Sequence, residues 1–304
     1  MIPNADLPLR AFSNALTGTE TPQANATIMI YADDGAAFEY VEKFLVDQFP
    51  DTLICRVTGK DLRDSEWLGC QSGMLVIPGI KGEECPYYDQ IGEQGRDNIK
   101  DFLERDENIL MTFCAGTYVI NEQIHYNIST GGFKSRTSPI ALIAGKAEGP
   151  PEGLSIRPQD DFTLTRIAYQ NGEGQETKAL LAHGNGPALD EDSITAQNGV
   201  LLGRYDDIEG KPAAGFKMPF GKGCIIALGT IPYFEPYDPS FYEGSDAFDK
   251  IMTMVECEPD RQAYCNLILS EIARHKPDLK PKLFDVTTAR HEIGTSTVPL
   301  EAVQ

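Results

Sequence analysis

The chain has 304 residues, and its 26 Lys and Arg against 46 Asp and Glu give a formal net charge of −20. This charge argues against nucleic acid and anionic membranes as partners, because both are polyanions. The proportions of hydrophobic residues (41%) and charged residues (24%) are those of a globular protein, and the length suits one large domain or two small ones.

Strands and helices are expected to alternate along the first half of the chain. A polar stretch over residues 1–26 is expected to form a loosely attached arm. Short apolar segments, typical of buried strands, then alternate with segments of helical periodicity. Such alternation builds βαβ units, so we expect a doubly wound, flavodoxin-like and mostly parallel α/β sheet. The expected strands are Thr27–Ala32, Thr52–Val57, Gly73–Ile77 and Asn108–Phe113, and the expected helices are 38–49, Gly92–Arg105 and the segment after Cys114.

The second half is expected to be rich in antiparallel strands. Gly-rich turns separate its apolar segments, with little helix between them, and two helices close the domain. We therefore expect one domain over residues 27–275 and an extended tail over 276–304. The expected strands are Phe162–Tyr169, Thr177–His183, Val200–Tyr205, Pro212–Met218 and Cys224–Leu228, and the helices are Ser245–Glu256 and Asp260–Arg274.

The cysteines and histidines do not form the spacings of a metal site. The chain has 7 Cys and 4 His, with no Cys-x-x-Cys pair and no two His four residues apart, which argues against zinc. An odd cysteine count without a signal peptide or a long apolar run predicts reduced thiols in a cytoplasmic protein. We expect neither a metal nor a cofactor.

Cys114 stands where an expected buried strand meets an expected helix, and the small residues Ala115 and Gly116 follow it. This order of strand, sharp turn and helix is that of a nucleophile elbow, which lifts a side chain above the carboxyl edge of the sheet. A helix N-terminus stabilises a thiolate, so the pattern predicts a lowered thiol pKa. The alternative is a small buried residue at the end of a strand.

Several motifs occur in the order found in one protein family. Phe113–Tyr118 (FCAGTY) resembles the Cys-Ala-Gly-Ala-Tyr elbow of the domain at the N-terminus of some biotin-protein ligases. That domain belongs to the class I glutamine amidotransferase-like superfamily. The resemblance covers about residues 27–240, and the order of the motifs makes it stronger than any one of them. The other similar segments are Ile30-Tyr31, Leu75–Gly79 with Tyr87-Tyr88, Leu142–Pro150, Gly184–Pro187, Leu201–Tyr205 and Gly221–Gly223.

The resemblance implies a thiol nucleophile at Cys114 that hydrolyses an amide such as glutamine. Its oxyanion donors would be the backbone N–H of Ala115 and that of Gly79 or Ile80, which stabilise the tetrahedral intermediate of acyl transfer. Tyr118 follows Cys114 by one helical turn and is expected to line the same pocket.

The chain also departs from the family at the positions that activate the nucleophile. The family has His-Pro-Glu after its last strand, whereas this chain has Ile231-Pro232-Tyr233. Isoleucine cannot accept a proton, so this route to a thiolate is lost. Ile80 also replaces the second loop glycine, and Thr112 the first glycine of the elbow. Nothing in this sequence resembles the ligase half of the longer family members, so biotin transfer is not expected.

Among the four histidines, His183 is the serious candidate for another base, because it ends an expected strand and enters a Gly-Asn-Gly turn. The alternative is that its imidazole hydrogen-bonds a turn carbonyl. His125 is expected about three helical turns beyond Cys114, facing away. Tyr88 and Tyr233 are further candidates for the pocket, whereas Asp33-Asp34 and Glu83-Glu84 are typical of solvated loops.

Three hypotheses remain open for the function. In the first, a degenerate relative without glutaminase activity binds a small molecule or a partner at the Cys114 cleft. In the second, Cys114 and His183 form an active amidase whose substrate is a small-molecule amide. In the third, the chain is an acidic structural or interaction protein. The missing His and Glu at positions 231 and 233 favour the first.

Overall fold

The structure, a computed structural model, describes residues 26–69, 71–81, 85–128, 132–154, 162–233 and 248–286. The expected N-terminal arm up to residue 25 and the tail beyond residue 286 lie outside these residues, as do Glu83 and Glu84. The strands are β1 (Thr27–Tyr31), β2 (Ala36–Ala37), β3 (Leu53–Val57), β4 (Gly73–Ile77), β5 (Gly79–Ile80), β6 (Ile109–Phe113), β7 (Asn121–Ile128), β8 (Gly132–Thr137), β9 (Ile143–Gly149), β10 (Thr163–Gln170), β11 (Glu176–His183), β12 (Ala188–Leu189), β13 (Val200–Tyr205), β14 (Ala213–Phe220) and β15 (Gly223–Leu228). The helices are α1 (Glu39–Gln48), α2 (Gly59–Arg63), α3 (Ser65–Gly69), α4 (Tyr87–Arg105), α5 (Ala115–Val119), α6 (Glu191–Ala196), α7 (Phe248–Glu256) and α8 (Glu258–His275).

The centre of the molecule is a parallel sheet of five strands. Its order is β3-β1-β4-β6-β15, with parallel pairing throughout. If these strands are renumbered along the chain, the order is 2-1-3-4-5, the flavodoxin-like arrangement. The expected doubly wound sheet is therefore confirmed. The fifth strand comes from the second half of the chain, so the two halves share one sheet.

The remaining strands extend this sheet through mostly antiparallel pairs. Beyond β15 the order continues β14-β12-β9-β7-β8, and β13, β10 and β11 branch from β14. The antiparallel second half is therefore confirmed. However, the sequence interpretation missed β7, β8 and β9, which follow α5. His125 lies in β7 rather than beyond a long helix, because α5 ends after five residues at Val119.

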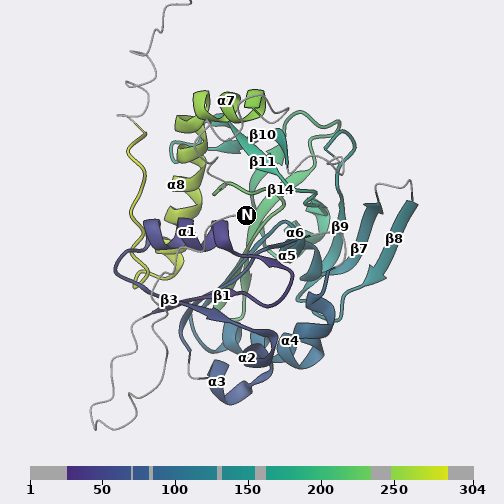
Figure 1. The fold of residues 1–304 in the computed structure, drawn as a ribbon, viewed down its shortest axis with the longest axis vertical. Coiled ribbons are helices and arrows are strands. Elements are labelled where there is room, and N and C mark those ends of the chain that lie inside the picture. The colour runs from purple at the N-terminus through teal and green to yellow at the C-terminus, as the bar shows by residue number, and fades with distance from the viewer. Residues whose placement is uncertain are drawn as a thin grey trace, which may run out of the picture.

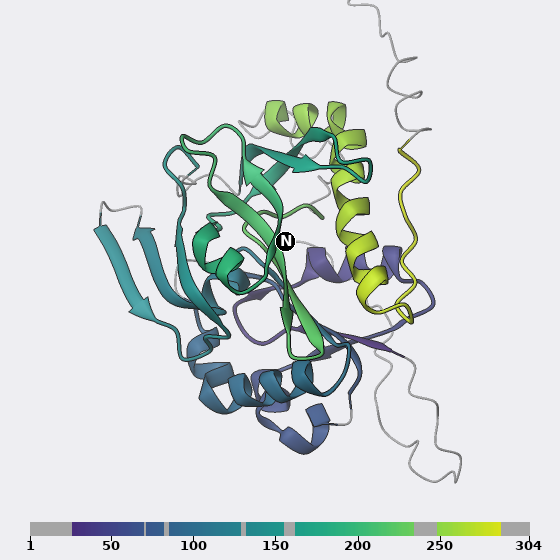
Figure 2. The same ribbon diagram turned by 180° about the vertical axis from the view of Figure 1, so that it is seen from behind.

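Helices cover both faces of the parallel strands (Figures 1 and 2). Successive residues of β1 point to opposite faces, so Ile28 packs with α1 and α8, whereas Met29 packs with α2, α3 and α4. The buried faces of the strands explain why these segments are apolar throughout rather than alternating. Helix α4 begins at Tyr87, five residues before the expected start, and Gly92 interrupts it with φ 62°.

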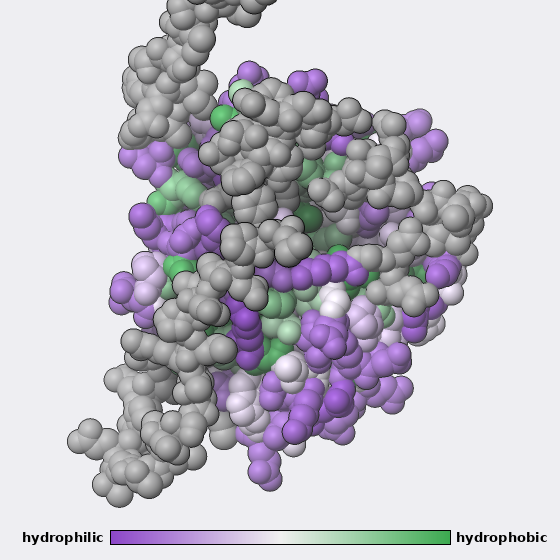
Figure 3. All heavy atoms as spheres, in the orientation of Figure 1, coloured by the Kyte–Doolittle hydropathy of each residue, from purple (hydrophilic) through white to green (hydrophobic). Residues whose placement is uncertain are grey.

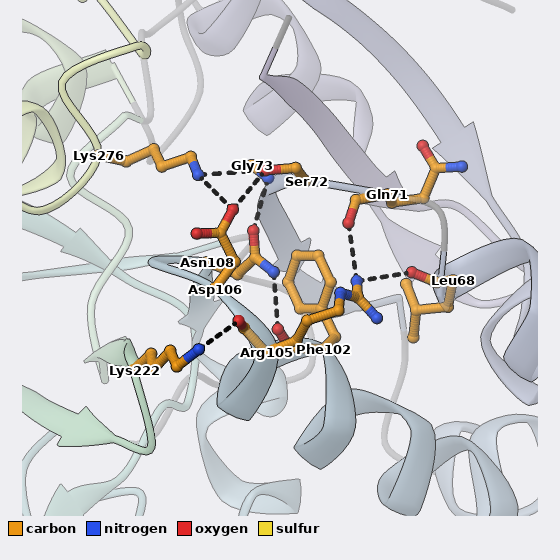
Figure 4. Close-up of polar contacts among 10 residues, drawn as sticks. All are labelled: Leu68, Gln71, Ser72, Gly73, Phe102, Arg105, Asp106, Asn108, Lys222 and Lys276. Carbon is orange, nitrogen blue, oxygen red and sulfur yellow. Dashed lines mark hydrogen bonds and ion pairs between the residues drawn. The ribbon is translucent and has the colours of Figure 1, made fainter. Parts of the chain in front are cut away.

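A polar network joins the C-terminal end of α8 to the amino ends of the parallel strands (Figure 4). The Lys276 ammonium donates to Asp106 at 2.9 Å and to the Ser72 hydroxyl at 3.1 Å. The Asn108 side chain accepts from the Gly73 N–H and donates to the Phe102 carbonyl. The first residues of the expected tail therefore pack against the domain.

One face of the molecule shows where hydrophilic side chains gather (Figure 3). In Figure 3, hydrophilic residues dominate the lower part of the face, where α2, α3 and α4 lie in the same view. No helix among the described residues is long and apolar enough to cross a membrane.

Candidate functional site

Cys114 connects β6 to α5 in a strained backbone conformation. Its φ is 48° and its ψ is −113°, and positive φ is uncommon for residues other than glycine. The Cys114 N–H and the Thr117 hydroxyl both donate to the Leu228 carbonyl, at 2.9 and 2.8 Å. A methyl group on Gly116 would lie 2.3 Å from the Ile77 carbonyl oxygen, so only glycine permits this approach of α5 to β4.

The Cys114 thiol is buried and protonated. Only 6% of the residue is exposed, and Sγ donates to the Gly184 carbonyl at 2.9 Å. Burial raises the pKa of the thiol to about 12, and the Ala115 N–H opposes this rise. The expected lowering of the pKa is therefore wrong, because desolvation outweighs the field of a helix of only five residues.

The Ile231 side chain and the thiol both lie close to Gly184. A methyl group on Gly184 would lie 3.0 Å from Cδ1 of Ile231 and 3.8 Å from Sγ of Cys114, so both side chains adjoin the same point. A hydrogen bond from the Ile231 N–H to the Ala182 carbonyl, 3.0 Å long, holds this residue beside β11. The side chain at this position, beside Gly184, is thus aliphatic.

His183 is the last residue of β11, and its imidazole faces the core. The residue is fully buried, with Nε2 3.2 Å from the Gly186 carbonyl and the ring edge-on to Tyr205. Nδ1 has no hydrogen-bond partner among the described residues. Burial lowers the pKa of the imidazole to about 4, so the side chain is neutral at pH 7. The thiol contacts the backbone of the next residue, Gly184, and its hydrogen bond is not to the imidazole.

The loop after β4 lies against Cys114. A methyl group on Gly79 would be 3.4 Å from the Cys114 Cβ, and the Tyr87 hydroxyl donates to the Gly79 carbonyl at 2.6 Å. Gly79 and Ile80 form β5, which pairs with β2 so that Ile80 is opposite Ala36. The Lys81 N–H donates to the Gly35 carbonyl. N–H directions alternate along a strand, so the Ile80 N–H points away from β2.

A pocket of about 330 Å³ opens above Cys114. Tyr88, Tyr118, Ile80 and Ala115 all line it, so the structure brings most of the expected site residues together. Tyr233 does not line it but packs in the core, with its ring centroid 4.5 Å from that of Phe113. The lining residues are Ile80, Cys85, Tyr88, Asp89, Cys114, Ala115, Tyr118, Ile124, Tyr126, Lys134, Arg136, Gly184 and Asn185.

The outer wall of the pocket consists of residues that the sequence interpretation did not single out. Ile124 and Tyr126 lie in β7, opposite Arg136 and Lys134 of β8, and all four line the pocket. The available signal was Gly131-Gly132, a typical hairpin turn between two segments of moderate strand character. No group of three or more His, Cys, Asp and Glu among the described residues is placed to hold a metal ion.

The chain was compared with known families, proteins and structures. The family model "Biotin-protein ligase, N terminal" matches residues 26–288. No curated protein matches the chain.

The chain was also matched to solved structures, three of which are as follows. A glutamine amidotransferase is 14% identical, with a TM-score of 0.46, covering 75% of this chain and 100% of its own. The glutaminase domain of Trypanosoma brucei CTPS with bound acivicin is 10% identical, with a TM-score of 0.45, covering 75% and 93%. A β-galactosidase from Bacillus circulans sp. alkalophilus is 12% identical, with a TM-score of 0.40. The match covers 68% of this chain and 29% of the β-galactosidase chain. At these values the likeness carries no inference about activity.

Proposed function

The chain belongs to the biotin-protein ligase N-terminal family, and from this premise we propose that it is a divergent amidotransferase-like protein that binds a small molecule at the Cys114 pocket and lacks glutaminase activity. One observation carries this proposal. Among the described residues the thiol hydrogen-bonds to the Gly184 carbonyl, and the position of the family's histidine holds Ile231; neither group can take its proton.

The chemistry of amide hydrolysis explains why this matters. A thiolate must attack the amide carbonyl, and the leaving nitrogen must then receive a proton, which a neighbouring base normally accepts and returns. Because burial raises the pKa of the thiol to about 12, the sulfur keeps its proton at pH 7. No base in the described part of the chain accepts a hydrogen bond from the thiol, which instead donates to the Gly184 carbonyl.

The pocket retains the groups that would hold a ligand. The N–H of Ala115 faces the sulfur, and that of Ile80 points away from β2, so these two are our candidates for donors to a ligand carbonyl. The resemblance left Gly79 and Ile80 open as the loop donor. Because N–H directions alternate along β5, the Ile80 N–H is the one free of β2, and we favour Ile80. The rings of Tyr88 and Tyr118 supply apolar walls.

The other two hypotheses have less support. An amidase with His183 as base requires an imidazole at the thiol, but that imidazole is hydrogen-bonded to Gly186. A purely structural role leaves the open pocket unused. The cytoplasm remains our proposed compartment because all six described cysteines are free thiols.

Two measurements test the proposal: ammonia release by the wild-type protein and by Cys114→Ser, and alkylation of Cys114 in the wild-type protein. We expect equal release of ammonia from glutamine by both proteins. We also expect iodoacetamide to alkylate Cys114 only as the pH rises above about 8.5, the pKa of a free cysteine, with glutathione as the reference thiol. Ammonia release that depends on Cys114, or rapid alkylation at pH 7 or below, would overturn it.

A further inference from the structure

Part of the wall of the Cys114 pocket is one face of the β7–β8 hairpin, and it is cationic. Lys134 and Arg136 are two residues apart in β8, so their side chains lie on the same face of the strand. Both residues are exposed, and both line the pocket. Asp89 is the single carboxylate among the described lining residues, so the balance is positive in a protein whose net charge is −20.

The Arg136 guanidinium is held in place by an aromatic ring rather than by an acid. Its central carbon lies 3.6 Å from the centroid of the Tyr88 ring. This contact orients the planar group while leaving its N–H donors along the edge. Neither Arg136 nor Lys134 forms an ion pair with any residue in the described part of the chain.

The two ends of the pocket therefore differ in chemistry. At the floor are the buried Cys114 thiol and the N–H of Ala115, which suit an uncharged polar group such as a carbonyl. The lining also includes the largely apolar side chains of Tyr118, Ile124 and Tyr126, and the ring centroids of Tyr118 and Tyr126 lie 5.6 Å apart. At the rim are the two cations. A guanidinium edge matches the paired oxygens of a carboxylate or a phosphate.

We propose that Arg136, with Lys134 beside it, binds the anionic group of a small ligand, a carboxylate or phosphate, whose uncharged end reaches Cys114. This inference rests on the proposed function, because it names the class of ligand for the same pocket. Arg136 is then the residue that determines specificity, and the Tyr88 ring positions it.

Two alkylating reagents of nearly equal size test this proposal. Iodoacetate is an anion and iodoacetamide is its neutral counterpart, and both react with thiols. The measurement is the ratio of their rate constants at Cys114, obtained by peptide mapping at a pH near 9. We expect Arg136→Gln to lower the iodoacetate to iodoacetamide ratio by about fivefold, equivalent to roughly 1 kcal/mol. Arg136→Lys is expected to give an intermediate ratio, because lysine keeps the positive charge but lacks the paired N–H donors of the guanidinium.

Lys280→Gln is the matched control, since it removes an exposed positive charge outside the pocket lining. We expect its ratio to equal that of the wild type. An equal ratio in the wild type and Arg136→Gln would overturn the proposal. The proposed function fails on different grounds, namely ammonia release or absolute thiol reactivity, whereas this test compares two reagents at one thiol.

A protection experiment identifies the anion. Benzoate, its neutral isostere benzamide and inorganic phosphate are each added at constant ionic strength while iodoacetamide labels Cys114. Protection by benzoate and not benzamide, lost in Arg136→Gln, supports a carboxylate ligand. Protection by inorganic phosphate with the same dependence on Arg136 supports a phosphate ligand. If neither anion protects more than benzamide does, the proposal is wrong.

Discussion

At the scale of single residues, the neighbours of Cys114 control its chemistry more than its place in the chain does. The strained turn presents the sulfur to the pocket, but burial holds the proton on it. In the segment after β15, the side chain that lies beside Gly184 is Ile231, which can neither accept a proton nor stabilise a thiolate. Restoring one basic group at this position should therefore change the titration of the thiol.

Ile231→His is expected to lower the apparent pKa of Cys114 by about one unit or more. An imidazolium beside the sulfur stabilises the thiolate, and one unit corresponds to about 1.4 kcal/mol. The measurement is the pH profile of alkylation by iodoacetamide at Cys114. Ile231→Leu controls for repacking, because it keeps the volume and adds no charge. Identical profiles for the two variants would show that position 231 does not face the thiol.

At the scale of elements, the site depends on close contact between α5 and the end of β4. Gly116 permits this contact, because a side chain there would meet the carbonyl oxygens of Ile77 and Pro78. The helix is short, so its packing rather than its length keeps Cys114 in the strained conformation.

Gly116→Ala is expected to destabilise the protein by about 1–3 kcal/mol, because the added methyl group must displace backbone. Urea denaturation followed by circular dichroism measures this change. Gly172→Ala is the matched control, since a methyl group at Gly172 meets no atom within 4 Å. A stability loss no larger than that of Gly172→Ala would contradict the proposed role of the contact.

The β7–β8 hairpin is the element that sequence patterns described least well. Parallel strands such as β4 are buried on both faces and therefore form continuous apolar runs, and the expected bounds Gly73–Ile77 match the structure. In β8, by contrast, Lys134 to Thr137 are all exposed, so local hydrophobicity carries no signal. The cationic wall of the pocket was missed for this reason.

At the scale of the whole molecule, the network at Lys276 connects α8 to the amino ends of the parallel strands (Figure 4). Cys114 lies at their carboxyl ends, on the other side of the sheet's length. Hydrogen bonds lower the pKa of Asp106 to about 2. The bond from Lys276 has the largest effect, and those from the Glu107 backbone and the Ser72 hydroxyl have smaller ones. Because an unfolded Asp titrates near 3.9, this contact stabilises the fold fully above that pH, and the stabilisation is lost as the pH falls towards 2.

Asp106→Asn is expected to destabilise the protein at pH 5 and to have little effect near pH 2. At the lower pH, wild-type Asp106 is itself partly protonated, so the two proteins become alike. The difference between their urea midpoints at the two pH values measures this. Asp101→Asn provides the control, because Asp101 is exposed and lies outside the network. A gap that is equal at both pH values would contradict the assignment.

The sequence by itself determined the alternation of strands and helices, the position of Cys114 at the end of a strand, and the isoleucine in place of a histidine. These features are local, since they depend on periodicity and on residue order within short segments. Only the tertiary structure decided that the thiol is protonated, that His183 hydrogen-bonds a turn carbonyl, and that Arg136 faces the pocket. The physical reason is that desolvation and contact arise between segments far apart in the chain, such as Cys114 and Gly184, which come together only when the sheet forms.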